Sequence, residues 1–320
     1  MKKRSAALLI CFLTLLFCLP ARGELSYRLT GNGLLYIKAD HRYANNAGHF
    51  GISRMKEGVR LINAALDGLE GKVPVFLYLA ENSRSHQLAD KFPEESPAYQ
   101  YLLENLHVDK ADHLKYRTYE EFCRYFYATD HHWNHVGSYQ GYRDAVELVL
   151  GRDTLCLPPA EEITLPVLFQ GSFAKQERNP ISRENFAFYR FDGIPDYTVY
   201  VNGKRASYGN LDAYLNGRYS TKKYENHYAL LYGGDVAQTV LESARQDGPV
   251  LLMLCNSYAS PLKALLTFHF SRVVCVDLRF YRQTFHQDFS LSRAVEEFEA
   301  DYVLLLGDVK MFIDADHIVP

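Results

Sequence analysis

Apolar residues recur along the chain in an alternation of helical and strand-like spacing. Residues 52–69 carry apolar side chains three and four positions apart and end before a glycine, and residues 73–80 form an apolar run typical of a buried strand. Strands that alternate with helices predict a mostly parallel sheet covered by helices on both faces. The other predicted elements are helices at 99–106, 119–127, 141–150, 236–246, 261–270 and 290–299 and strands at 33–37, 250–254, 272–278 and 302–306.

The middle of the chain departs from this alternation. It contains several turn pairs between short alternating runs, and Asn202-Gly203 after the run 197–201 indicates a β-hairpin. We therefore predict an α/β fold. One three-layer α/β/α domain, residues 24–320, is expected to be interrupted by a β-rich insertion at about 160–233.

The first 23 residues form a segment of a different kind. Three basic residues precede the apolar stretch Ala6–Leu19, and Pro20 and Gly23 follow it. This pattern predicts a secretory signal peptide cleaved after Gly23, and therefore an exported protein that is secreted or held at the outer face of the membrane. The 14-residue apolar stretch is shorter than the about 20 residues that cross a bilayer comfortably, although an uncleaved signal anchor stays open as the alternative.

The charge balance excludes one class of partner. Without its first 23 residues, which hold four basic and no acidic side chains, the chain has 31 Lys and Arg against 38 Asp and Glu, a net charge of −7. A chain this acidic is not expected to bind nucleic acid. The four remaining cysteines are too few for a disulfide framework, although one disulfide stays open, and Cys255 and Cys275 lie in apolar runs that predict core positions.

Two tracts carry residue types that suit nucleophilic catalysis. Asp130 and His132 are two positions apart, so in an extended loop both side chains point to one side while His131 points away. Ser257 follows an apolar strand, at the carboxyl edge where parallel sheets gather functional residues. A serine hydroxyl becomes a nucleophile when an imidazole takes its proton and a carboxylate orients that imidazole. Asp130, His132 and Ser257 are therefore candidates for a catalytic triad that transfers acyl groups.

The same edge of the sheet is expected to hold the residues that follow two other strands, Arg279 and Gly307-Asp308. Arg279 is a candidate for holding the acyl oxygen or an anionic sugar, and an ion pair with Asp277 is its structural alternative. For Ser257 the structural alternative is a hydrogen bond at the end of a strand.

A metal site is the chemical alternative for the histidines. His131 and His135 are four positions apart, a spacing that suits a metal pair on one helix, yet no glutamate follows His131 as the zinc-protease motif requires. We therefore predict no metal and no other cofactor. The structural alternative for Asp130 and His132 is a polar loop packed under Trp133.

The Asp130-His131-His132-Trp133 tract resembles the signature of the DHHW family, whose members are similar to alginate O-acetyltransferases. The resemblance runs from about residue 31 to the C-terminus. It implies a circularly permuted SGNH-hydrolase-like fold, in which Asp-x-His precedes the serine along the chain. The other tracts that carry it are Gly137, Gly171-Ser172-Phe173-Ala174, Tyr232-Gly233-Gly234-Asp235, Asn256-Ser257-Tyr258-Ala259 and Asp277-Leu278-Arg279.

The sequence departs from the SGNH pattern near the expected oxyanion hole. It has Cys255-Asn256-Ser257 in place of Gly-Asp-Ser, and Asp308 where an asparagine would be a better donor. These departures affect the oxyanion hole more than the triad.

The resemblance implies a role for each candidate residue. Ser257 is the predicted nucleophile, His132 the general base and Asp130 the residue that orients His132. The candidates for oxyanion or substrate binding are Trp133, Gly234, Tyr258 and Arg279. Structural alternatives are a turn at Gly233-Gly234 and a core position for Tyr258.

We expect an exported, serine-dependent O-acetyltransferase that acts on a cell-envelope or secreted polysaccharide through an acyl-serine intermediate. The resemblance implies a membrane-bound O-acyltransferase as the partner that supplies acetyl groups. The same triad also suits a carbohydrate acetylesterase, because only the exclusion of water from the acyl-enzyme separates transfer from hydrolysis. A non-catalytic glycan-binding or assembly protein, with the β-rich segment as its binding surface, is the remaining alternative.

Overall fold

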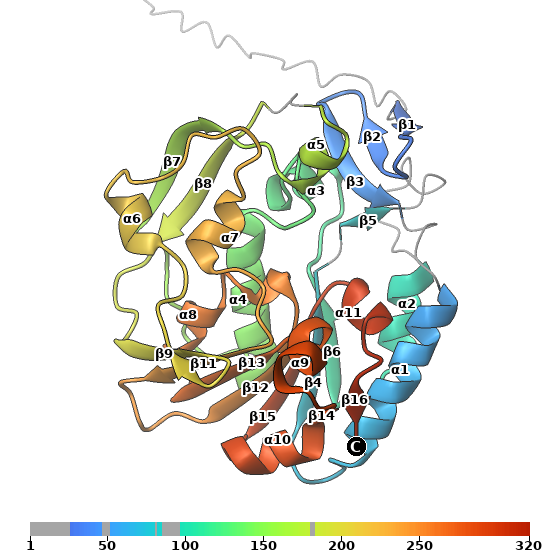
Figure 1. Ribbon diagram of the computed structural model, residues 1–320, viewed down its shortest axis with the longest axis vertical. Coiled ribbons are helices and arrows are strands. Elements are labelled where there is room, and N and C mark those ends of the chain that lie inside the picture. The colour runs from blue at the N-terminus through green and yellow to red at the C-terminus, as the bar shows by residue number, and fades with distance from the viewer. Residues whose placement is uncertain (1–25, 47–51, 81, 85–96, 180–182) are drawn as a thin grey trace, which may run out of the picture.

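A central sheet organises the molecule. The computed structural model describes residues 26–46, 52–80, 82–84, 97–179 and 183–320, and the predicted signal peptide lies outside these ranges. The sheet has eight strands in the order β10-β9-β11-β13-β12-β15-β4-β6 (Figure 1). These strands are β4 (Val75–Leu79), β6 (Lys110–His113), β9 (Tyr197–Val201), β10 (Lys204–Arg205), β11 (Gln238–Ser243), β12 (Val250–Cys255), β13 (Arg272–Val276) and β15 (Tyr302–Gly307).

The sheet is mixed, and five of its eight strands form one parallel block. The strands from β13 to β6 run parallel to one another, whereas β11, β9 and β10 join the sheet antiparallel. The helix predicted at 236–246 is wrong, because β11 lies there and pairs with both β9 and β13. The segment contains the β-branched residues Thr239 and Val240, which favour a strand where neighbouring strands offer backbone partners.

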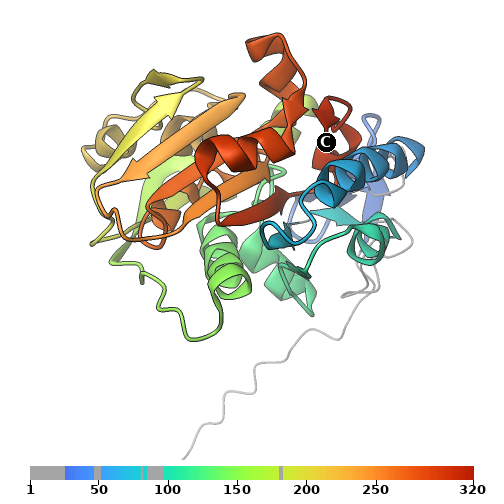
Figure 2. The ribbon, with the colours of Figure 1, turned by 90° about the horizontal axis from the view of Figure 1, so that it is seen from below.

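Helices cover both faces of the sheet, so the predicted three layers are present (Figure 2). One face carries α1 (Ile52–Asp67), α2 (Pro97–Asn105) and α10 (Leu291–Phe298), and the other carries α4 (His135–Leu150) and α8 (Lys263–Leu266). Leu252 and Leu254 of β12 pack toward the first face, and Leu251 and Met253 pack toward the second. Successive side chains of one strand thus enter two separate cores, which explains the unbroken apolar run in the sequence.

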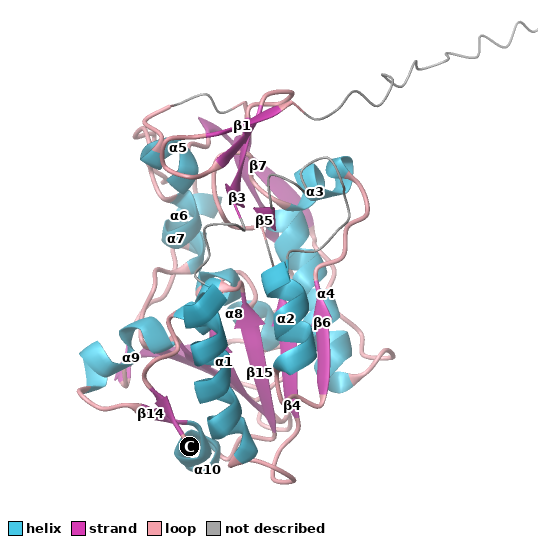
Figure 3. Ribbon diagram, turned by 90° about the vertical axis from the view of Figure 1, so that its right-hand side faces the viewer, coloured by secondary structure: helices cyan, strands magenta, loops and turns pink. Residues whose placement is uncertain are grey.

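Smaller sheets lie above the central sheet in Figure 3. One consists of β1 (Tyr27–Leu29), β2 (Leu35–Ile37), β3 (Arg42–Asn46) and β5 (Ser83–Arg84), and another of β7 (Glu161–Leu168) and β8 (Asn185–Arg190). A third short pair, β14 (Phe289–Ser290) and β16 (Ile318–Val319), lies near the C-terminus.

The segment predicted as a β-rich insertion, 160–233, contributes to two parts of the molecule. β7 and β8 pair with each other, whereas β9 and β10 extend the central sheet. The segment also contains three short helices, α5 (Ser172–Gln176), α6 (Leu211–Leu215) and α7 (His227–Tyr232). The hairpin predicted from Asn202-Gly203 is confirmed, because these residues join β9 to β10 with φ angles of 49° and 78°.

Cys255 and Cys275 are buried in the core, as predicted, and all four cysteines in the described ranges are free thiols. Among the helices of the described residues, none combines the length and the apolar character needed to cross a membrane.

Candidate active site

The loop between α3 (Tyr119–Tyr125) and α4 carries the Asp-His-His-Trp tract. It is fixed at its end by Asn134, whose side-chain oxygen accepts hydrogen bonds from two N–H groups of the first turn of α4 (3.0 Å each). Trp133 is fully buried, and the missing side chain of Gly141 in α4 leaves the space that its indole ring fills. Trp133 is therefore a core anchor of the loop. This burial contradicts the prediction that Trp133 contacts substrate.

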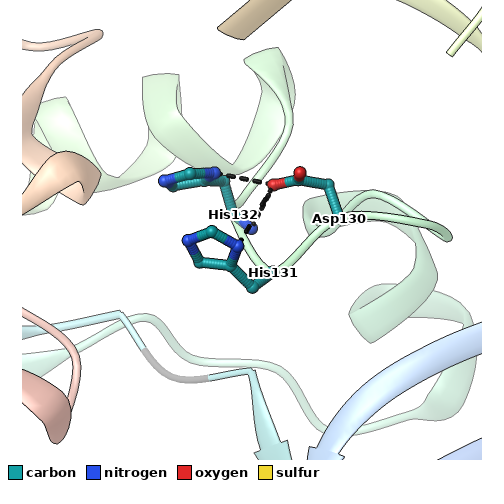
Figure 4. Close-up of side chains that lie close together, drawn as sticks. All are labelled: Asp130, His131 and His132. Atoms are coloured by element: carbon teal, nitrogen blue, oxygen red, sulfur yellow. Dashed lines mark hydrogen bonds and ion pairs between the residues drawn. The ribbon is translucent and has the colours of Figure 1, made fainter. Parts of the chain in front are cut away.

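Asp130, His132 and Ser257 form one continuous hydrogen-bonded chain. The distance from Asp130 Oδ1 to His132 Nδ1 is 2.6 Å, and that from His132 Nε2 to Ser257 Oγ is 2.7 Å. Figure 4 shows the carboxylate beside the imidazole. Because the carboxylate can only accept, it fixes the proton on Nδ1, and the lone pair of Nε2 then faces the serine hydroxyl. The structure thus brings together the three residues that the sequence assigned to a triad.

Donors surround the carboxylate of Asp130. Its Oδ1 also accepts the backbone N–H of His132 (2.9 Å), and its Oδ2 accepts the backbone N–H of Ser172 (2.7 Å). Gly171 packs against the carboxylate, where any side chain would collide with it. Burial would raise the pKa of Asp130, but the adjacent imidazoles and N–H groups outweigh it and hold the pKa below its ordinary value. The group is therefore ionised at neutral pH.

Ser257 begins a single turn of 3₁₀ helix directly after β12. Asn256 shapes this turn, because its Oδ1 accepts the N–H of Tyr258 (3.2 Å) and its Nδ2 donates to Asp308 (2.8 Å). Gly307, at the end of β15, leaves room for the amide of Asn256. Within the described part of the chain, the backbone N–H of Ser257 has no hydrogen-bond acceptor. It is therefore available to an oxyanion.

His131 lies beside His132 rather than pointing away, so the expectation from an extended loop is wrong. The two rings are 3.8 Å apart between centroids, and His131 Nδ1 lies 2.7 Å from Ser172 Oγ (Figure 4). The chain turns at this tract instead of extending, which brings neighbouring side chains to one side. Burial and the neighbouring His132 lower the pKa of His131 to about 3, so this imidazole is neutral.

Tyr228 of α7 is a site residue that the sequence analysis missed. Its ring stacks on His132 at 3.9 Å between centroids with an interplanar angle of 12°. Its hydroxyl donates to the backbone carbonyl of Ser257 (3.0 Å). Tyr228 thus holds the imidazole and the serine turn together. Nothing local in the sequence marks it, because α7 is one of several tyrosine-rich stretches.

A pocket of about 350 Å³ opens in front of Ser257. Its lining residues are His131, His132, Asn226, Tyr228, Ala229, Asp235, Asn256, Ser257, Tyr258, Arg279, Asp308 and Lys310. They come from the Asp-His loop, from α7 and from the ends of β12, β13 and β15, so the predicted gathering at the carboxyl edge of the sheet is found.

Arg279 lies in the first turn of α9 (Leu278–Phe285), and the ion pair with Asp277 considered from the sequence is found. It pairs with both carboxylate oxygens of Asp277 (Nε–Oδ1 2.9 Å, Nη2–Oδ2 2.5 Å) and lies 3.4 Å from Asp235. It also lines the pocket beside Ser257. Burial alone would lower the pKa of Arg279, but the two carboxylates raise it above its ordinary value. The guanidinium is therefore charged and held in place, and the carboxylates of Asp277 and Asp235 offset its charge.

The other two candidates have mixed outcomes. Tyr258 is buried, its hydroxyl donates to the backbone carbonyl of His131, and one side of it reaches the pocket. Gly234 lines a water-sized cavity next to Ser257, and its carbonyl accepts a hydrogen bond from Tyr208 (2.7 Å). The turn expected here is made by Gly233, which has a φ of 92° at the end of α7.

Comparison with known proteins supports the fold. No protein-family model matches the chain, and no curated protein matches its sequence. A solved DHHW family protein from Eubacterium siraeum superposes with a TM-score of 0.64 at 15% identity, over 92% of this chain and 98% of that one. This chain shares the fold of a DHHW family protein. The resemblance seen in the sequence is therefore confirmed at the level of structure.

A second solved structure with the same fold is that of PatB1 from Bacillus cereus with a sulfonyl adduct. It has a TM-score of 0.64 and 18% identity, and the match covers 90% of this chain and 99% of that one. Another structure of Bacillus cereus PatB1 matches with a TM-score of 0.60 and 19% identity, over 88% of this chain and 99% of that one. At such identities the likeness shows the fold.

Proposed function

We propose that this protein is a serine-dependent O-acyltransferase that moves acetyl groups onto a polysaccharide. The observation that carries the proposal is the chain of hydrogen bonds from Asp130 through His132 to Ser257, which ends at an open pocket. A structural role alone needs neither a buried ionised carboxylate nor a serine hydroxyl facing a pocket.

The geometry supports a double displacement. Ser257 Oγ attacks the acyl carbon as His132 Nε2 takes the hydroxyl proton, and Asp130 stabilises the imidazolium that forms. The tetrahedral intermediate then collapses, and the leaving group departs with the proton from His132. The acyl-serine is next attacked by an acceptor hydroxyl, which gives its proton to His132. The second tetrahedral intermediate then collapses, the bond to Ser257 Oγ breaks, and His132 returns the proton to Ser257 as the new ester leaves.

The oxyanion of each tetrahedral intermediate needs donors beside Ser257. The unpaired backbone N–H of Ser257 is the first, and the guanidinium of Arg279 in the same pocket is the second. Asp308 stands where an asparagine would donate. Burial raises the pKa of Asp308, and its Oδ1 accepts hydrogen bonds from Asn256 Nδ2 (2.8 Å) and the Lys310 N–H (3.1 Å). We propose that Asp308 supports the serine turn through Asn256 rather than holding the oxyanion.

Transfer, the polysaccharide acceptor, export and a membrane-bound O-acyltransferase that supplies the acetyl groups are part of the same proposal. They rest on the DHHW resemblance and on the signal-like residues 1–23. PatB1, which has the same fold, has been solved with a sulfonyl adduct, and a sulfonyl group is an electrophile that an activated hydroxyl can capture.

The test is the release of p-nitrophenol from p-nitrophenyl acetate by the purified full-length protein and by Ser257→Ala. The variant is expected to lose at least about 10³-fold in kcat, because the nucleophile is gone. A polysaccharide acceptor is then added, and acetyl found on the acceptor supports transfer, whereas acetyl found only as acetate favours a carbohydrate acetylesterase. Equal inactivity of the folded wild type and variant would favour a non-catalytic glycan-binding protein.

A further inference from the structure

The paired histidines do more than the proposed triad requires. A triad needs one imidazole, yet His131 lies against His132 with 3.8 Å between ring centroids and lines the same pocket. The carboxylate of Asp130 completes a group whose potential ligand atoms all lie within 4.8 Å of one another. This arrangement differs from the pair of His131 and His135 considered from the sequence, because His135 packs against Tyr189.

Both imidazoles use the same nitrogen for hydrogen bonding. Nδ1 of His132 lies 2.6 Å from Asp130 Oδ1, and Nδ1 of His131 lies 2.7 Å from Ser172 Oγ and 3.7 Å from the same carboxylate oxygen. Figure 4 shows both Nδ1 atoms toward Asp130 and both Nε2 atoms on the opposite side. Histidines that bind metal usually donate Nδ1–H to such an oxygen and present Nε2 to the ion.

We infer that a borderline transition cation such as Zn²⁺ binds between Nε2 of His131 and Nε2 of His132 and blocks the serine site. Two imidazole nitrogens on one tetrahedral zinc ion lie roughly 3.3 Å apart, and the centroids of the two rings are 3.8 Å apart. Ser257 Oγ, 2.7 Å from His132 Nε2, is placed as a third ligand, and water from the pocket completes the shell. Imidazole ligands favour Zn²⁺, Cu²⁺ or Ni²⁺ over Mg²⁺ and Ca²⁺.

Charge in the pocket permits such an ion. Arg279 is paired with Asp277 and lies 3.4 Å from Asp235, so these two carboxylates offset part of its repulsion of a cation. Lys310 is exposed, and the buried Asp308 lies in the same pocket lining. The ion would bind the lone pair of His132 Nε2, so this nitrogen could no longer take the proton of Ser257. The inhibition therefore rests on the proposed function, whereas the binding does not.

Calorimetric titration of the full-length protein with zinc chloride tests the binding directly. One ion per chain is expected, and His131→Gln should weaken its affinity about tenfold or more, because one of two imidazole ligands is lost. Ser172→Ala should weaken it about tenfold, since it removes only the hydroxyl behind His131 and leaves the backbone N–H on Asp130 in place. His107→Gln, at an exposed histidine beside Asp67, is the control and should bind as the wild type does.

Zinc should also suppress hydrolysis of p-nitrophenyl acetate with the midpoint found by titration, and EDTA should restore the rate. Magnesium chloride at the same concentrations should leave the rate unchanged. Unchanged zinc affinity in both His131→Gln and Ser172→Ala, or no heat with the wild type, would overturn the site. Zinc binding without loss of hydrolysis would overturn the inhibition. A wild type that binds zinc but never cleaves the ester would count against the proposed function and leave the metal site standing.

Discussion

The two sides of the candidate site are built in different ways. On the loop side, Asp130 and His132 are buried, and nearly every polar atom of the pair has a partner at a fixed distance. On the sheet-edge side, Arg279, Asp235 and Lys310 are partly or fully exposed and meet as charged groups around an open pocket. A proton relay needs fixed distances, and burial supplies them, whereas a substrate must enter and leave through the other side.

This contrast predicts where substitutions act most strongly. Changes on the loop side should alter the chemistry or the folding, because buried partners are left without compensation. Changes on the sheet-edge side should alter activity by smaller factors, because water can replace what is lost.

Asp130→Asn should lower kcat for p-nitrophenyl acetate by about 10⁴-fold while the protein stays folded, because an amide in place of the carboxylate favours the wrong tautomer of His132. Asp235→Asn, at the sheet edge, is the matched control and should change kcat by less than about tenfold. Steady-state kinetics with circular dichroism as the folding check would decide. Equal effects of the two substitutions would remove the distinction between the two sides.

Trp133→Ala should lower the free energy of unfolding by about 3–5 kcal/mol, because it empties a fully buried aromatic position behind the loop. Leu155→Ala, at a side chain that is 84% exposed, is the control and should change stability by less than about 0.5 kcal/mol. Urea unfolding measures both. A small effect of Trp133→Ala would show that the indole is not the anchor of the loop.

Glu184 should make stability depend on pH. It accepts the N–H groups of Ala128 (2.7 Å) and Thr129 (3.2 Å) just before the site, and burial raises its pKa from 4.5 to about 7. The folded state then binds the proton more tightly than the unfolded state. Stability is therefore full below about pH 4.5 and falls by up to about 3 kcal/mol as the pH rises through 7.

Glu184→Gln should remove this slope, and Glu120→Gln, at an exposed position of α3, should keep it. The measurement is the midpoint of urea unfolding from pH 4.5 to 8, since other groups contribute equally to all three proteins. A wild-type slope that Glu184→Gln leaves unchanged would assign the pH dependence to another group.

Arg279→Ala should lower kcat/KM by about tenfold, the size expected for one partly solvated oxyanion or substrate contact. Arg279→Lys should recover only part of this, because an ammonium group cannot reproduce the bidentate pair with Asp277. If Arg279→Ala keeps the kcat/KM of the wild type, backbone donors alone hold the oxyanion.

The sequence was sufficient for those parts of the fold that are buried on both faces. β12 and β15 were predicted within one residue, because a short, unbroken apolar run between turn residues is typical of a strand buried on both faces. β11 was taken for a helix because Val236, Val240 and Ala244 lie four positions apart, and its pairing with β9 and β13 decides the outcome. Which strands join the sheet antiparallel is equally a matter of long-range pairing, and no local pattern encodes it.

The site residues also differ in whether local sequence or long-range packing places them. Asp130, His132 and Ser257 were found because their chemistry is recognisable and strand ends converge at one edge. The direction of His131 was predicted wrongly, because a turn replaces the extended loop on which side-chain alternation depends. Trp133 was predicted at the substrate site, but its ring fills the space beside Gly141 of α4. Only the packing of α4 against the loop shows this. Tyr228 could not be predicted, because only the fold brings α7 over the imidazole.

The most direct test of the central claim is to trap the acyl-enzyme. The full-length protein is mixed with p-nitrophenyl acetate, quenched in acid within one turnover and digested, and the peptides are sequenced by mass spectrometry. We expect one acetyl group on Ser257, much less of it in His132→Gln, and its disappearance when an acceptor is added before the quench. Acetyl on another residue, or none at all in a protein that still releases p-nitrophenol, would show that Ser257 is not the nucleophile.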